Sequence, residues 1–187
     1  MEGGDVGMRF LEKGAAPLTV EANIRAEHDA VHEKFHALLA SLSESDWHRQ
    51  SLNPGWTNAE IMSHILFGFI IVAALLPLSR LWGRFPRGSS RWFAQLLDAL
   101  TRPFNWINAL GARMQATVFL PQRVGPIFDR VHRNLLKQIA SIHEEEWQNG
   151  MYYPTKWDAN FSDFMTLERV CYYPIVHFEF HAAQIAR

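Results

Sequence analysis

The most informative stretch of the chain is residues 57–81, which read TNAEIMSHILFGFIIVAALLPLSRL. Thr57 is followed three residues later by Glu60, the pattern of a capping box, in which each side chain bonds the backbone N–H of the other residue. This pattern predicts a helix that starts at Thr57 and runs to about Leu81. Because the stretch is apolar on nearly every side, we expect other elements to cover most of the helix.

A membrane span is the alternative for the apolar part of this stretch, Ile61 to Leu78. Three features favour a helix buried in a soluble bundle: an ionisable residue at His64, a proline at Pro77 and the polar cap at Thr57. We therefore expect contact with a membrane, if any, to involve only its surface.

Three more helices are predicted around this one, because apolar residues recur with a helical period. Their spans are residues 20–42, 121–147 and 162–186, with Thr166 as an alternative start of the last. No stretch alternates polar and apolar residues as a half-buried strand does. The sequence therefore predicts an all-α protein whose main architecture is a four-helix bundle.

The bulk composition is that of a globular protein. The chain has 187 residues, 48% of them hydrophobic and 20% charged, and a formal net charge of −1. This length and balance fit one domain over residues 1–187, and we expect residues 1–16 to be disordered. The single cysteine, Cys171, rules out an internal disulfide, and the N-terminus lacks the pattern of a secretory signal. We expect a cytoplasmic protein.

Residues 82–120 separate the second and third predicted helices and are interpreted as an inserted helical hairpin, broken by proline and glycine. Arginines and aromatic residues accumulate in and around it: Arg80, Arg84, Arg87, Arg91, Arg102, Arg113 and Arg123 with Trp82, Trp92, Phe93, Phe104 and Trp106. Such a surface could bind an anionic amphipathic ligand, a membrane surface or a dimer partner. We favour a lid or interaction surface at the mouth of the bundle, and we expect no nucleic-acid binding.

Three histidines form the strongest candidate site. His177 and His181 lie four residues apart on the last predicted helix, so both side chains leave one face of it and could chelate one ion. His64 also lies on an apolar helix, and Gly68, one turn on, would leave open space beside it. Neutral imidazoles suit zinc, nickel or a similar divalent ion. The alternative is that each is a buried core histidine with a hydrogen-bond partner.

The order of these motifs resembles the DinB superfamily. The resemblance rests on Trp56-Thr57 opening a helix, on Glu60 and His64 along it, and on residues 177–185, HFEFHAAQI, closing the chain. It covers the chain from about residue 17 to the end, without the insert. It implies a four-helix bundle with a metal on His64, His177 and His181, and it matches Gln184 to a residue often found after the histidine pair.

Three residues near the triad are weaker catalytic candidates. Glu60 could be a fourth ligand or an outer acceptor for an imidazole, although the helix cap is favoured. Gln184 could orient substrate or metal-bound water, or satisfy a buried backbone group. Tyr173 could donate a proton or serve only in packing. Cys171 is interpreted as a buried apolar residue without a nucleophilic role.

Histidines in the first predicted helix form a competing set. His28, His32 and His36 make two further pairs spaced by four, but His32 and His36 lie off the apolar face and are expected at the surface. The remaining histidines, His48, His132 and His143, have no partner in the sequence and are expected to be structural or exposed.

Two functions follow from the resemblance and the residues. The first is a metal-dependent enzyme acting on a small molecule, of the thiol S-transferase type, with a low-molecular-weight thiol such as mycothiol or bacillithiol as co-substrate; the resemblance alone implies this, together with a homodimer. The second is a non-catalytic binding protein with a structural metal, whose basic aromatic insert binds an amphipathic or protein partner. A catalytic metal needs an open coordination position, whereas a structural metal is saturated by protein ligands.

Overall fold

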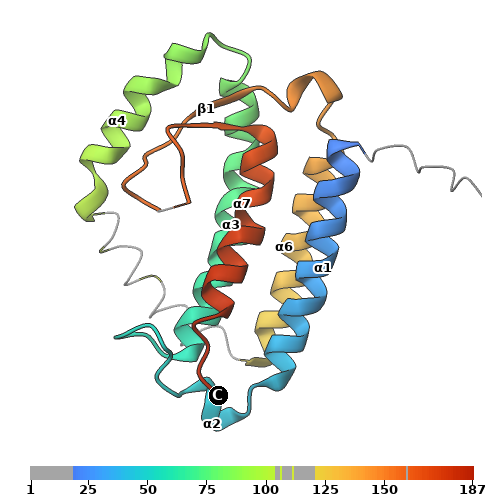
Figure 1. The fold of residues 1–187 in the computed structure, drawn as a ribbon, viewed down its shortest axis with the longest axis vertical. Helices are drawn as coiled ribbons and strands as arrows, with labels where there is room; N and C mark the ends of the chain where they lie inside the picture. Colours follow the sequence, from blue (N-terminus) through green and yellow to red (C-terminus); the bar gives the residue numbers. More distant parts are fainter. Residues whose placement is uncertain (1–18, 104–105, 107–110, 112–120, 159) are drawn as a thin grey trace, which may run out of the picture.

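The protein's computed structural model describes residues 19–103, 106, 111, 121–158 and 160–187. Four long helices form the described bundle: α1 (Val20–Ser41), α3 (Asn58–Trp82), α6 (Pro121–Ile139) and α7 (Leu167–Ala182). Helix α3 packs against α6 and α7, and α1 packs against the same two helices (Figure 1). The predicted all-α bundle is confirmed. Residues 1–16, with their predicted disorder, lie outside the described part.

Helix α3 neighbours α6 and α7, and its start is where the capping box predicts it. The hydroxyl of Thr57 accepts from the backbone N–H of Glu60, and the Glu60 carboxylate accepts from the backbone N–H of Thr57 at 2.6 Å. The helix is long and apolar enough to cross a membrane, but more than half of its most apolar window is buried inside the protein. Packing against α6, α7 and strand β1 (Gly150–Tyr152) covers much of the helix, whereas Leu75, Leu78 and Leu81 stay partly exposed.

Two predicted helix ends are too late. Helix α6 ends at Ile139 instead of Trp147, because the chain turns at Ser141, whose hydroxyl donates to the Gln138 carbonyl, and a separate 3-10 turn, η2 (Glu144–Glu146), follows. Helix α7 begins after Thr166, one of the two predicted starts, and ends at Ala182 instead of Ala186. The residues after Ala182 bond to another segment instead, since the Gln184 carbonyl accepts from the N–H of Leu52.

A small antiparallel sheet contradicts the expectation that no strand is present. Strand β1 (Gly150–Tyr152) pairs with β2 (Phe164–Thr166), with Met151 opposite Met165. Strands of three residues are too short to produce a recognisable alternation. The pair closes the aromatic loop, residues 151–161, and returns the chain to the start of α7.

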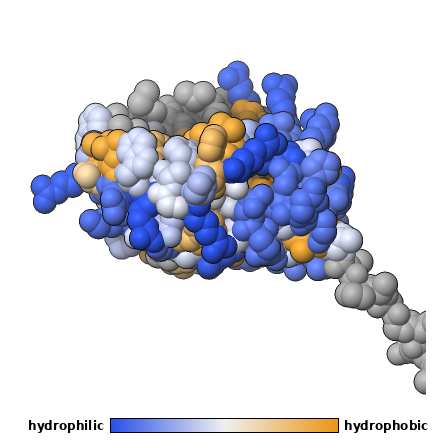
Figure 2. All heavy atoms as spheres, turned by 90° about the horizontal axis from the view of Figure 1, so that it is seen from above, coloured by the Kyte–Doolittle hydropathy of each residue, from blue (hydrophilic) through white to orange (hydrophobic). Residues whose placement is uncertain are grey.

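The insert lies beside this sheet. Its described part contains the 3-10 turn η1 (Arg87–Ser90) and helix α4 (Arg91–Ala99). Arg87 lies over the ring of Phe164 and Arg91 over that of Tyr152, so both arginines bind the insert to the sheet. Most of the second half of the predicted hairpin, including Phe104 and Arg113, lies outside the described residues. In Figure 2 hydrophobic side chains gather on the side of α4, and the side of α1 is mostly hydrophilic.

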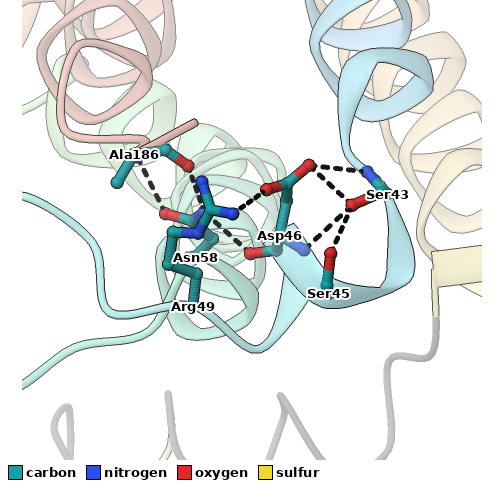
Figure 3. A network of polar contacts seen from close by, with 6 residues as sticks. All are labelled: Ser43, Ser45, Asp46, Arg49, Asn58 and Ala186. Carbon is teal, nitrogen blue, oxygen red and sulfur yellow. Dashed lines mark hydrogen bonds and ion pairs between the residues drawn. The ribbon is translucent and has the colours of Figure 1, made fainter.

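Asn58 joins the start of α3 to the end of the chain. Its side-chain amide donates to the carbonyls of Asp46 and Ala186, and its carbonyl oxygen accepts from the N–H of Ala186 (Figure 3). The Asp46 carboxylate binds Arg49 and the hydroxyl of Ser43. Because Asn58 is fully buried, these bonds hold the segment after α7 at a constant position beside α3.

Replacement of Asn58 by alanine is expected to lower the free energy of unfolding by about 2–4 kcal/mol, since a buried side chain loses three hydrogen bonds and Ala186 loses those of both its N–H and its carbonyl. Urea unfolding measures the change. Ser45→Ala, an exposed position in the same network, is the control and is expected to change the value by less than about 0.5 kcal/mol. Equal effects of the two variants would contradict this role of Asn58.

Candidate metal centre

The structure brings His64 of α3 together with His177 and His181 of α7. One nitrogen of each imidazole lies within 4.8 Å of the others, and Nε2 of His64 lies 3.2 Å from Nε2 of His177. The His177 side chain is almost fully buried and that of His64 partly buried. His64 and His177 are 113 positions apart in the sequence, and they meet because α3 and α7 pack directly against each other.

Gly68 allows the His177 ring to lie close to the backbone of α3. A Cβ atom at Gly68 would lie 2.6 Å from Nδ1 and 2.7 Å from Cε1 of His177, closer than real Cβ atoms come. The absent side chain therefore makes room for the His177 ring itself. Gly68 and His64 both line the cavity described below, so open space remains beside the pair, while the His177 ring fills the position of a Gly68 side chain.

Gln184 fixes the orientation of one imidazole. Its side-chain oxygen lies 3.0 Å from Nδ1 of His181 and also accepts from the amide of Asn53 at 3.3 Å. A proton on Nδ1 of His181 leaves its Nε2 unprotonated and free to act as a donor to a cation. Gln184 thus acts on His181 rather than on a buried backbone group.

The nitrogen atoms of the other two imidazoles fit a bound cation. Two Nε2 atoms that face each other at 3.2 Å require either a proton or a cation between them. The Nδ1 atoms of His64 and His177 are buried without a hydrogen-bond partner in the described structure. The facing Nε2 atoms are therefore the ones that could hold an ion, with the proton of each ring on Nδ1.

Burial keeps all three imidazoles neutral near pH 7. Desolvation, together with the nearby His181, lowers the pKa of His64 to about 4. Burial and the neighbouring imidazoles hold the pKa of His177 well below its ordinary value, and burial lowers that of His181. A neutral imidazole is the form that binds a metal ion.

The metal-free protein is expected to lose stability as the pH falls from about 6.5 to about 4. Burial lowers the pKa of His28, like that of His64, to about 4, whereas the unfolded chain takes up protons below about 6.5. Above pH 6.5 neither state is protonated, so no change is expected there. At pH 5 each of these two histidines is expected to lower the free energy of unfolding by on the order of 2 kcal/mol. Urea unfolding in a chelator at pH 7 and pH 5 measures this, and equal stabilities would contradict it.

The triad opens on a large apolar cavity of about 630 Å³. Its walls come from α3, α7, the aromatic loop and the insert, which contributes Phe93 and Leu97 of α4. Trp157 of the aromatic loop donates its indole N–H to the Leu97 carbonyl and joins two of these walls. The described part of the insert therefore forms one wall of the cavity beside the triad.

Asp158 is a site residue that the sequence analysis missed. It is the one Asp, Glu, Lys or Arg among the described residues that line the cavity. Its carboxylate accepts from the Tyr173 hydroxyl at 2.7 Å and from the backbone and side chain of Asn160. Its negative charge acts on His64 and His181 in the direction that favours a positive charge there. No periodic pattern marks Asp158, because it lies in a loop.

The other candidates have mainly structural contacts. Tyr173 directs its hydroxyl to Asp158, and burial raises its pKa. The Glu60 carboxylate caps α3. Cys171 is buried, which raises the pKa of its thiol to about 12, and its carbonyl contacts Nε2 of His28 at 2.9 Å. His132 is buried against the His28 carbonyl, whereas His48 is exposed.

A helical bundle in which imidazoles from two helices meet at an apolar cavity defines a candidate metal-binding bundle protein. The chain belongs to the DinB superfamily, whose family model matches residues 27–185. The fold is similar to that in the crystal structure of a mycothiol-dependent maleylpyruvate isomerase, with a TM-score of 0.64 and 11% sequence identity. The match covers 91% of this chain and 64% of that one. No curated protein matches the chain.

Proposed function

We propose that the protein is a divalent-metal-dependent enzyme of the thiol S-transferase type, in which His64, His177 and His181 hold the ion. The observation that carries this proposal is that the three imidazoles open directly on the 630 Å³ cavity. A metal at such a position has protein ligands on one side and room for a co-substrate on the other. Membership of the DinB superfamily, and the fold shared with a mycothiol-dependent isomerase, support the thiol as co-substrate.

Zinc or nickel is the proposed ion, because all three donors are imidazole nitrogens. When bound, such an ion would lower the pKa of a thiol or water beside it and polarise a substrate carbonyl. Gln184 keeps His181 in the required tautomer, and Asp158 supplies a negative charge that compensates part of the charge of the cation.

The walls of the cavity indicate the class of substrate. Aromatic and aliphatic side chains dominate them, and no Lys or Arg is among the described lining residues. An apolar wall excludes water and binds apolar groups, and a carboxylate on the substrate would find no Lys or Arg side chain there, only the bound ion. We propose a small, mostly apolar substrate whose polar group lies at the ion.

The alternative is a non-catalytic binding protein with a structural metal. It requires a ligand set closed by the protein, with a fourth donor such as Glu60 or His28. Among the described residues only the three imidazoles belong to the cluster. The Glu60 carboxylate caps α3, and Nε2 of His28 faces the Cys171 carbonyl. These contacts support the open site.

A cobalt-substituted sample tests the open position. The full chain is loaded with Co²⁺, and mycothiol, bacillithiol or glutathione is added while the visible and near-ultraviolet spectrum is recorded. We expect a sulfur-to-cobalt charge-transfer band with at least one thiol and a shift of the cobalt bands. Bound cobalt whose spectrum no thiol changes at millimolar concentration would refute the thiol-dependent enzyme and leave the structural metal.

We also propose that the protein is cytoplasmic and forms a homodimer. Three apolar residues spaced by four on the insert, Trp92, Leu96 and Leu100, are exposed. A second copy of the chain could cover this strip. Analytical ultracentrifugation tests the dimer: a sedimentation coefficient of the monomer at micromolar concentration would contradict it.

A further inference from the structure

A second cluster of possible metal donors lies away from the cavity, between α1 and α6. His32 and His36 project from α1, and Asp129 projects from α6. Nε2 of each histidine lies 2.7 Å from the same oxygen, Oδ1 of Asp129, and the three donor atoms lie within 4.8 Å of one another. The sequence spacing anticipates the histidine pair but places it in solvent, whereas the packing of α1 on α6 adds the carboxylate.

The rings in this cluster are held in place by their neighbours. His32 is stacked on Phe128, with ring centroids 5.7 Å apart, and lies 4.8 Å from the ring of His132. His132 is itself held by the carbonyl of His28. Rings packed in this way lose little further freedom when they bind an ion, which favours binding.

The carboxylate of Asp129 is an anion in this setting. Burial acts to raise its pKa, but hydrogen bonds from His36 and His32 outweigh burial and hold the pKa below its ordinary value. A carboxylate oxygen has two lone pairs, so Oδ1 of Asp129 can accept from both imidazoles at once. Here two imidazole nitrogens converge on one oxygen, as the donors of a single ion do.

We propose that His32, His36 and Asp129 form a second divalent-metal site that links α1 to α6. Two imidazoles and a carboxylate favour a transition ion such as Zn²⁺, Ni²⁺ or Co²⁺ over Mg²⁺ and Ca²⁺, which prefer oxygen ligands alone. The side chains are 35%, 38% and 32% exposed, so water completes the coordination. The ion at this site exchanges readily, unlike the ion at the buried triad, and stabilises the packing of the two helices.

The test counts ions on the full chain. Metal-stripped protein is titrated with Co²⁺ and with Zn²⁺ by calorimetry, and the number of ions per chain is compared for wild type, His36→Ala and Asp129→Asn. Wild type is expected to bind two ions, and each variant is expected to bind the weaker one at least about tenfold less tightly. Saturating Zn²⁺ is expected to raise the Tm of His177→Ala/His181→Ala by about 5 °C or more, an effect lost when His36→Ala is added.

His48→Ala is the matched control, since His48 is an exposed histidine outside both described clusters. It is expected to bind two ions like wild type. Circular dichroism of each variant shows whether it folds, and if the double variant does not, the single variants decide. One ion per chain in wild type that His177→Ala/His181→Ala loses and His36→Ala keeps would overturn the second site. One ion with the reverse pattern would instead refute the triad.

Discussion

Replacing both His177 and His181 by alanine is expected to abolish tight metal binding. Binding of zinc at a tetrahedral structural site contributes a free energy on the order of 10–16 kcal/mol, which is about 3 kcal/mol for each ligand. The loss of two ligands therefore lowers the affinity for the ion roughly 10⁴-fold. The remaining ligand, His64, cannot hold the ion alone. Elemental mass spectrometry after desalting measures this: about one tightly held ion per chain in wild type and none in the variant.

The chain contains its own control for this experiment. His32 and His36 have the same spacing on another helix, and their replacement by alanine removes two imidazoles without touching the cavity. This second variant is expected to keep the tightly held ion. A folded His177→Ala/His181→Ala variant that retains the tightly held ion would refute the triad as the metal centre.

Gly68→Ala is expected to lower the metal affinity by about 10- to 100-fold without removing any ligand. The new Cβ would lie 2.6 Å from Nδ1 of His177, so the ring must move, and its Nε2 moves relative to His64. Overpacking at this buried position costs about 1–3 kcal/mol of stability as well. Competition with a chromogenic chelator measures the affinity, and urea unfolding measures the stability.

Gly88→Ala is the matched substitution, because a Cβ at Gly88 meets no atom within 4 Å. Gly88→Ala is expected to leave the metal affinity and the free energy of unfolding unchanged. If Gly68→Ala bound the metal as tightly as wild type, the close approach of α3 to His177 would not be a requirement of the site.

The pattern of apolar residues and caps was sufficient to predict the bundle. The capping box at Thr57 and Glu60 sets the start of α3 by bonds between residues three apart, so sequence alone specifies it. The ends of α6 and α7 were placed too far along the chain. The segment after α7 bonds Leu52, which is remote in sequence, whereas α6 ends at a local turn in which the Ser141 hydroxyl donates to the Gln138 carbonyl.

Some residues of the candidate site were predictable from the sequence and others were not. The spacing of His177 and His181 puts both rings on one face of a helix, and the resemblance to the DinB superfamily added His64. Asp158 and the contact of Gln184 with His181 have no periodic signature, because the loop and the C-terminal turn bring them to the site. Asp129 could not be predicted either, because it meets His32 and His36 only through the packing of α6 on α1.

The sequence by itself thus determined the helices, their apolar faces and the chelating pairs, because these depend on periodicity and on contacts between residues three or four apart. Only the tertiary structure decided which helices are neighbours, where the cavity opens and which carboxylates stand beside the imidazoles. Those features depend on packing between segments about 100 residues apart, such as His64 against His177, and local pattern carries no information about such contacts.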